Sequence, residues 1–245
     1  MFRSTISKKI RNFLGLRPSY FLIDFRKNNH SISDAFFWRT DNHFSTTFNF
    51  SDLLNIFFDI KGSNIDIIFF DKFGQFLKII EFKDINYSKN LIIDKKLMNN
   101  IEDYGTFFIF HNTSSNFKSI IRNSCYTGYS YKNNLPSFVH GNLCSAMKDL
   151  ENNKISYDII GKSFFKTNKY FVQNYINSKK TEILIMNPTN NNLDLLINNQ
   201  KYTLKTRNSR LIEVKSKIIE IESDCYLIRP IIFSYENTYL DVYHG

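Results

Sequence analysis

From residue 36 onward, the apolar residues occur in short runs rich in Ile, Phe and Tyr, and polar turn residues separate these runs. β-Branched and aromatic residues favour strands, and runs of this length suit strands better than helices. The pattern therefore predicts a mostly β protein. The chain has 245 residues, of which 42% are hydrophobic, so it is long and apolar enough to bury a sizeable core.

Two segments predict hairpins. The runs IDIIFF (65–70) and QFLKIIEF (75–82) flank the turn DKFG, in which we expect Gly74 to adopt a positive φ. The runs DLLI (194–197) and QKYTLK (200–205) flank Asn198 and Asn199, and Asn tolerates positive φ in a two-residue turn.

The surroundings of the two hairpins are similar. Each hairpin is followed by a short strand, an acidic turn containing Ile-Glu, and a long apolar strand that begins near Tyr104 or Tyr226. This similarity predicts a weak internal repeat. We therefore expect an antiparallel β-sandwich fold made of two related sandwich-like units, with a short N-terminal helix.

The second unit extends from TEILIMNPTNNNLDLLI to IESDCYLIRPIIF. It has an Asn-containing turn after an apolar strand, a basic strand end, and an ESD turn that leads into an apolar strand with Pro230. In these features it resembles the small β-sandwich of the sensory rhodopsin transducer family, over roughly a quarter of the chain. The histidine and arginine that the family has after its last strand are missing, since FSYENTYLD stands there. The resemblance implies a sandwich topology and transfers no function and no site residue.

The sequence divides into four predicted parts. They are a basic amphipathic N-terminal segment (1–28), a first β unit (29–121), a connection with a candidate binding loop (122–180), and a second β unit (181–245) packed with the first.

Two helices are expected. Within 4–14, Ile6, Ile10, Phe13 and Leu14 share one face, and basic residues lie between them. We expect this helix to dock on the body of the protein or on a partner subunit, and peripheral contact with an anionic membrane surface is the alternative. Within the connection, the spacing of Leu143, Ala146, Met147 and Leu150 predicts the second helix.

Charge and cysteine content restrict the partners and the compartment. The net charge is +9, but basic pairs such as Lys95–Lys96 and Lys179–Lys180 are dispersed among acidic residues and no nucleic-acid motif occurs, so a nucleic-acid partner is not expected. Three isolated cysteines suit a reducing compartment, which predicts a cytoplasmic location. No signal peptide or membrane span fits the sequence, and no cofactor is expected.

Enzyme motifs are absent from the sequence. It has no H-E-x-x-H or G-x-S-x-G motif and no glycine-rich phosphate loop. A metal-assisted enzyme that uses His43, His111 and His140 is one alternative function, and a structural module that mediates oligomer contacts is another. We favour a non-catalytic protein.

Two clusters of aromatic and polar residues predict a binding site. Flat rings rimmed by hydrogen-bonding groups suit a sugar or another polar ring. We expect both clusters to line one groove, with Trp38 exposed or half-exposed, and a small polar ligand or glycan as the partner. The candidate ligand-binding residues are Trp38, Arg39, Asp41 and His43 from the first cluster, and Arg122, Tyr126, Tyr129, Tyr131 and His140 from the second.

Overall fold

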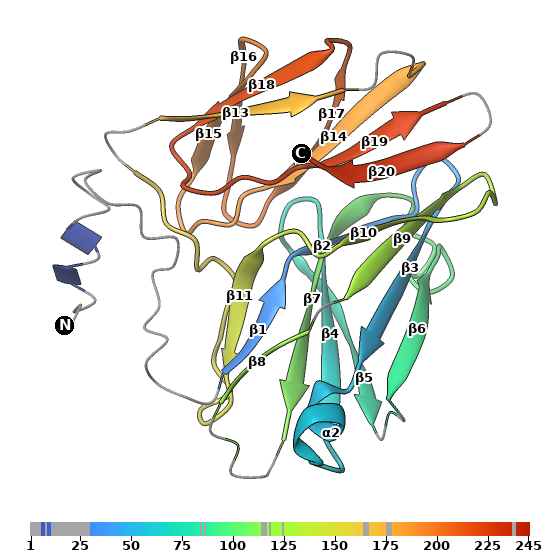
Figure 1. Cartoon of the computed structure of the whole chain (residues 1–245), viewed down its shortest axis with the longest axis vertical. Helices are drawn as coiled ribbons and strands as arrows, with labels where there is room; N and C mark the ends of the chain where they lie inside the picture. The colour runs from blue at the N-terminus through green and yellow to red at the C-terminus, as the bar shows by residue number, and fades with distance from the viewer. Residues whose placement is uncertain are drawn as a thin grey trace.

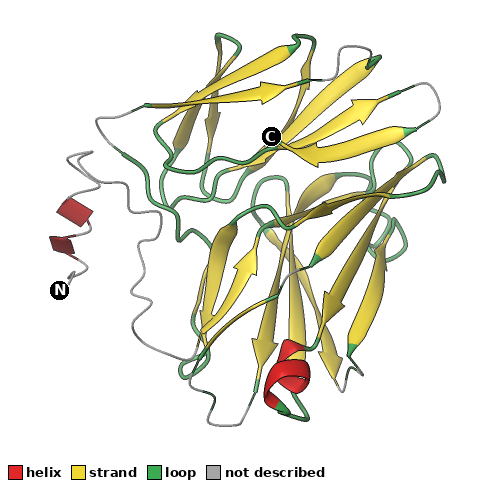
Figure 2. Ribbon diagram, viewed as in Figure 1, coloured by secondary structure: helices red, strands yellow, loops and turns green. Residues whose placement is uncertain are grey.

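The computed structural model of the chain consists of two β-sandwich units stacked one on the other (Figure 1). It describes residues 6–7, 9–10, 30–83, 85, 87–113, 117, 119–123, 125–163, 167–174, 178–236 and 239–245. Strands account for most of these residues (Figure 2). The predicted mostly β, sandwich-like architecture is confirmed.

The first unit contains three sheets of four strands. Sheet I has the order β2 (Phe36–Arg39), β7 (Tyr104–Asn112), β4 (Asn64–Asp71), β5 (Phe76–Lys83). Sheet II has the order β10 (Ser137–His140), β9 (Tyr126–Tyr131), β3 (Phe44–Ser51), β6 (Ser88–Ile93). Sheet III has the order β12 (Ile155–Ser156), β11 (Cys144–Asp149), β1 (His30–Asp34), β8 (Ile120–Arg122). The short helix α2 (Leu53–Phe58) follows β3.

The second unit contains two sheets. Sheet IV has the order β13 (Asn168–Gln173), β18 (Ile218–Ser223), β15 (Leu193–Ile197), β16 (Gln200–Leu204). Sheet V has the order β17 (Ser209–Val214), β14 (Lys180–Met186), β19 (Ile231–Tyr235), β20 (Leu240–His244).

The two units have the same strand order. Sheet I corresponds strand by strand to sheet IV, and sheet II to sheet V, when β2–β7 are matched to β13–β18 and β9–β10 to β19–β20. All the matched strand pairs are antiparallel. The turn between β9 and β10 therefore corresponds to the turn between β19 and β20.

Three large apolar clusters hold the layers together. One lies inside each sandwich, between sheets I and II and between sheets IV and V. The third joins the units, because it contains residues of both, and Phe233 of sheet V packs against Phe44 and Tyr129 of sheet II. Strands β7 and β14 are therefore buried on both faces, and each contains an unbroken apolar run, FFIF in β7 and ILIM in β14. The units share a core, and we call the boundary between them the seam.

Both predicted hairpins are confirmed. β4 pairs with β5, and Gly74 in their turn has φ of +71°. A Cβ atom at Gly74 would lie 2.9 Å from Cβ of Arg207 in the second unit, so the close approach of the two units also requires glycine here. β15 pairs with β16, and Asn198 and Asn199 have φ of 47° and 66°.

The predicted connection at 122–180 is not a separate segment. Strands β9 and β11 pair with β3 and β1 of the first unit, and β13 pairs with β18 of the second unit, so these residues contribute strands to both units. The helix expected around residues 143–150 is wrong, since the segment forms β11. This strand is buried on both faces, and its apolar residues therefore do not alternate as they would in a half-buried strand.

The predicted N-terminal helix lies mostly outside the described residues. Ile6, Ser7, Lys9 and Ile10 are helical, and the side chains of Ile6 and Ile10 are 69% and 52% exposed. No helix formed by the described residues is long and apolar enough to cross a membrane.

Candidate functional site

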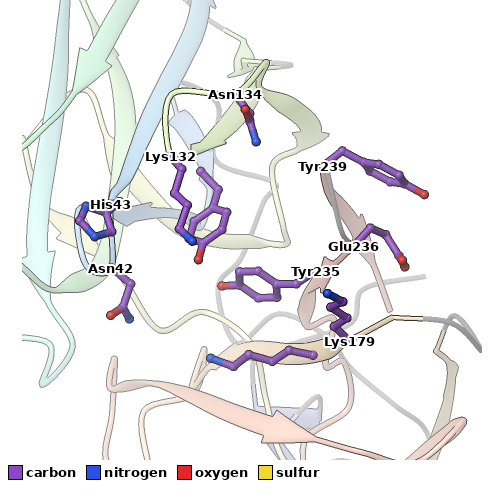
Figure 3. Close-up of a pocket in the computed structure, with 10 residues that line it drawn as sticks. Asn42, His43, Lys132, Asn134, Lys179, Tyr235, Glu236 and Tyr239 are labelled. Atoms are coloured by element: carbon purple, nitrogen blue, oxygen red, sulfur yellow. The ribbon is translucent and has the colours of Figure 1, made fainter.

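An open cleft of about 590 Å³ lies at one end of the seam. The first unit lines it with Asn42, His43, Tyr131, Lys132 and Asn134, and the second unit lines it with Lys179, Lys180, Tyr235, Glu236 and Tyr239. Figure 3 shows the labelled residues of the two sets facing each other. Each unit supplies about half of the wall.

Two tight turns form the wall from the first unit. In the turn between β2 and β3, the N–H of Phe44 donates to the carbonyl of Asp41 at 2.8 Å, and Asn42 and His43 have φ of 48° and 67°. Two successive positive φ angles are typical of a type I′ turn, which matches the twist of the strands it joins. Histidine visits this region infrequently, so the turn presents the imidazole at the cleft at some conformational cost.

The turn between β9 and β10 has the same form. The N–H of Asn134 donates to the carbonyl of Tyr131 at 3.1 Å, and Lys132 and Asn133 have φ of 52° and 60°. The N–H of Lys132 also donates to the carbonyl of His43 at 3.2 Å, which fixes the two turns side by side.

Equivalent strand ends form the opposite wall. In the first unit Phe44 pairs with Tyr131, and in the second unit Lys180 pairs with Tyr235, so the two tyrosines end equivalent strands. Their rings meet across the seam with centroids 5.2 Å apart and nearly perpendicular planes. Such edge-to-face pairs are favourable, and this one fixes the position of both rings.

A buried ion network, which we call the floor, contacts the lining residues Lys180 and Tyr235 from inside the protein. Arg39 is fully buried, and its Nη1 donates to Glu182 Oε2 at 2.8 Å. Its Nε and Nη2 donate to the two carboxylate oxygens of Asp41 at 3.0 and 2.7 Å. The guanidinium carbon also lies 4.0 Å from the ring centroid of Phe44 and 4.6 Å from that of Phe233. These contacts give Arg39 one fixed orientation.

Glu182 has three charged or polar partners. Besides Arg39, Tyr235 Oη donates to its Oε2 at 2.6 Å, and Lys180 Nζ lies 2.6 Å from its Oε1. Burial opposes ionisation of this carboxyl, but Arg39, Lys180 and Tyr235 outweigh burial and hold its pKa below the usual range. Burial raises the pKa of Tyr235, so this phenol stays protonated and continues to donate.

The cleft is basic and aromatic. Lys132 and Lys179 make no ion pair with any residue that the structure describes, and Glu236 is the one carboxylate among the described residues that line the cleft. Lys132 Nζ lies 4.9 Å from the ring centroid of Tyr131, and Lys180 Nζ lies 5.3 Å from that of Tyr235. Anions are therefore favoured here over cations.

The residues of the first predicted cluster lie at different depths, some at the surface and some buried. His43 lines the cleft, whereas Arg39 and Asp41 form the floor beneath it. The expected exposure of Trp38 is wrong, since this residue is fully buried and its Nε1 donates to the carbonyl of Phe70 at 2.9 Å. An aromatic side chain on a strand covered on both faces packs into a core, and no ligand reaches it.

The second predicted cluster divides in the same way. Tyr131 lines the cleft, but Tyr129 is fully buried and its hydroxyl donates to the carbonyl of Phe37 at 3.0 Å. Strand residues two apart share a face, yet the apolar cluster between the units covers Tyr129 while the strand end leaves Tyr131 at the rim.

Arg122, Tyr126 and His140 lie elsewhere in the first unit. Arg122 Nε and Nη2 donate to the carboxylate oxygens of Asp34, each at 2.9 Å. The rings of Tyr126 and His140 are 4.4 Å apart between centroids. Tyr126 and Tyr131 are at opposite ends of β9, so the expectation of one groove for both clusters is wrong for these three residues.

The three histidines of the metal alternative have different surroundings. His43 lies in the turn at the cleft, and the His140 ring packs against Tyr126 at a tilt of 42°. His111 is buried beside the start of α2, where its Nε2 is 3.3 Å from the backbone N of Leu53. Among the described residues, no group of three or more His, Cys, Asp or Glu side chains has a geometry that could hold a metal ion.

Sequence reasoning missed most of the second-unit wall. Lys179 and Lys180 were noticed only as one dispersed basic pair, and Tyr235, Glu236 and Tyr239 only as a departure from a family pattern. The similar order of strands in the two units was the available signal, because the residues that follow β9 and β19 lie at corresponding turns.

Comparison of the chain with protein-family models gives no match, and comparison with curated proteins gives none either.

Proposed function

We propose that the protein is a non-catalytic binding protein, and that its ligand is a carbohydrate or glycan precursor with an anionic substituent, held in the seam cleft. The observation that carries this proposal is the meeting of three tyrosines and three lysines in one open cleft above a fixed ion network. Tyr239 is 59% exposed and offers a ring face to the apolar side of a sugar. The lysines supply charge for a carboxylate or phosphate group.

The state of Glu182 favours binding over catalysis. A catalytic acid near neutral pH needs a raised pKa, whereas Arg39, Lys180 and Tyr235 lower the pKa of Glu182. Its oxygens accept from groups on both units, so its role is to hold the floor and the two walls in register.

We also propose an internal repeat and a cytoplasmic location. We infer that the two units are copies of one sandwich motif, since equivalent turns of both copies line the cleft. The described cysteines, Cys125, Cys144 and Cys225, are free thiols, which supports a reducing, cytoplasmic location. Partners other than the glycan are not part of the proposal.

The test is a screen of acidic and neutral glycans with the wild type and two variants. Tyr239→Ala removes the exposed ring of the cleft, and Tyr126→Ala removes an exposed ring of the first unit outside it. Loss of one stacking ring should cost on the order of 1 to 3 kcal/mol, roughly five- to 150-fold in affinity. We expect Tyr239→Ala to show this loss and Tyr126→Ala to bind like the wild type.

Two results would contradict the proposal. Wild-type protein that binds no glycan removes the ligand class. Binding that survives Tyr239→Ala but is lost in Tyr126→Ala moves the site from the cleft to the surface near Arg122.

A further inference from the structure

The seam cleft continues into a second hollow. Lys179 and Lys180, which line the cleft, also line an adjoining depression of about 170 Å³ together with Lys215 and Lys217. A third hollow of about 450 Å³ shares Lys217 and Asn174 with the second. The three hollows follow one another from the seam across the second unit.

The backbone fixes the row of lysines along this path. Thr181 pairs with Val214, so Lys180 and Lys215 lie next to the end of that ladder. The N–H of Asn174 donates to the carbonyl of Lys217 at 2.8 Å, which ties the second half of the row to the residue after β13.

The row has little neutralising charge. Among the described residues, Glu213 is the one acidic residue that lines the second hollow, and it lies 3.9 Å from Lys180, which also pairs with Glu182 at 2.6 Å. Lys179, Lys215 and Lys217 form no ion pair with another residue in the described part of the chain. Like charges that are left together without acidic partners create a positive potential that concentrates anions.

The far end of the path is apolar. Phe171 of β13 and Ile218 of β18 line the third hollow and are 66% and 61% exposed. Aromatic rings therefore occur in the cleft and in the third hollow, while none of the described residues that line the hollow between them is aromatic.

We propose that the ligand is an acidic oligosaccharide that starts in the seam cleft, crosses the row formed by Lys179, Lys180, Lys215 and Lys217, and ends on Phe171. This inference rests on the proposed function and specifies its ligand. A nucleic-acid strand fits less well, because proteins that track single strands stack successive bases on aromatic side chains, and no aromatic side chain is among the described residues that line the middle of this path. An acidic sugar chain requires charge there and ring contacts only at some of its units.

The experiment compares oligogalacturonates of increasing length. Binding of the monomer, trimer and hexamer is measured by calorimetry at low and at moderate salt. The wild type is compared with the double variant Lys215→Gln/Lys217→Gln and with Lys61→Gln/Lys83→Gln, which removes the same charge from exposed positions outside the three hollows.

We expect affinity to rise with length and to fall with salt. Two exposed lysine contacts are worth roughly a two- to thirtyfold change, so Lys215→Gln/Lys217→Gln should weaken hexamer binding by that factor and leave monomer binding unchanged. The Lys61→Gln/Lys83→Gln control should bind all lengths like the wild type.

Different results would contradict the extended binding site, the class of ligand and the proposed function. If the monomer and the hexamer bind with equal affinity, or if neither double variant changes the affinity for the hexamer, the ligand does not extend over the row of lysines. The proposed function of the cleft would still stand. Tighter binding of polyphosphate or of an oligonucleotide, lost in Lys215→Gln/Lys217→Gln, overturns the sugar class. If no length of galacturonate binds and the glycan screen is also empty, the proposed function itself fails.

Discussion

Arg39 Nη1 lies 2.8 Å from Glu182 Oε2, and this buried contact joins the two units across the seam although 143 residues separate the pair in the sequence. Arg39 ends β2 of the first unit, and Glu182 lies in β14 of the second. The pair lies directly beneath the cleft, so the stability of the seam and the shape of the site depend on the same contact.

Replacing Arg39 should destabilise the whole protein. Arg39→Met keeps the packing between Phe44 and Phe233 but removes the buried cation that pairs with Asp41 and Glu182, and leaves Glu182 with Lys180 as its cation. Breaking a buried pair in this way costs on the order of 3 to 5 kcal/mol. Urea unfolding measures the loss. Lys169→Gln, which breaks exposed pairs with Glu220 and Glu222, is the control and should cost about 1 kcal/mol or less. Equal effects of the two variants would contradict a structural role for the floor.

His111 should make the protein less stable in mild acid. Burial lowers its pKa from 6.5 to about 4, with a smaller opposing effect from Asp52. Between these values the unfolded chain binds a proton that the folded chain does not, so the free energy of unfolding falls as pH drops below 6.5. At pH 5 the deficit from this group is about 2 kcal/mol relative to pH 7.

His111→Gln tests this pH dependence, because its side chain can still accept from the N–H of Leu53 but does not titrate. Unfolding curves at pH 7 and pH 5 should differ less for the variant than for the wild type. The same pH dependence in both proteins would assign it to other groups, such as His244, whose pKa burial also lowers to about 4.

Trp38 should report on the core and not on the ligand. It is the single tryptophan of the chain and is fully buried. We expect iodide to quench its fluorescence only after unfolding. Trp38→Phe loses the hydrogen bond to the carbonyl of Phe70 and should lower stability by about 1 to 3 kcal/mol with unchanged glycan affinity. Quenching in the native state, or a loss of affinity without a loss of stability, would put Trp38 back at the surface.

Glycine substitutions in the two type I′ turns should weaken ligand binding without lowering the stability of the protein. Glycine adopts positive φ without steric cost, so His43→Gly and Lys132→Gly should unfold at urea concentrations no lower than the wild type while binding more weakly. Asn199→Gly, at a positive φ in the hairpin of β15 and β16, is the matched control and should leave binding unchanged. A loss of stability in His43→Gly that matches its loss of affinity would mean that the turn is structural only.

The sequence was most informative where a turn imposed the geometry. Gly74 and the pair Asn198–Asn199 were predicted to take positive φ, and the structure has both. Local sequence patterns wrongly predicted a helix at Cys144–Asp149, because the apolar residues of a strand that is buried on both faces can have helix-like spacing. They also missed α2, whose cap is the side chain of Asp52 accepting from the N–H of Asn55 at 3.2 Å.

The site was predicted in part for a similar reason. His43 and Tyr131 were recognised because their neighbours are polar, but the same criterion selected Trp38 and Tyr129, which the shared core covers. Burial at the seam depends on how two distant units pack, and local sequence does not encode it. Lys179, Lys180 and Tyr235 line a cleft only because the two units pack together.

Lysine-resolved NMR tests the central claim most directly. Reductive methylation with labelled carbon preserves the charge of each lysine and gives it a signal, and single Lys→Arg variants assign the signals. On addition of an acidic glycan, we predict shifts for Lys132, Lys179 and Lys180 at the seam cleft, and none for Lys61 and Lys83, which lie outside it. Shifts confined to Lys61 and Lys83, or no shift at Lys132, Lys179 and Lys180 when calorimetry shows binding, would contradict a ligand site at the seam.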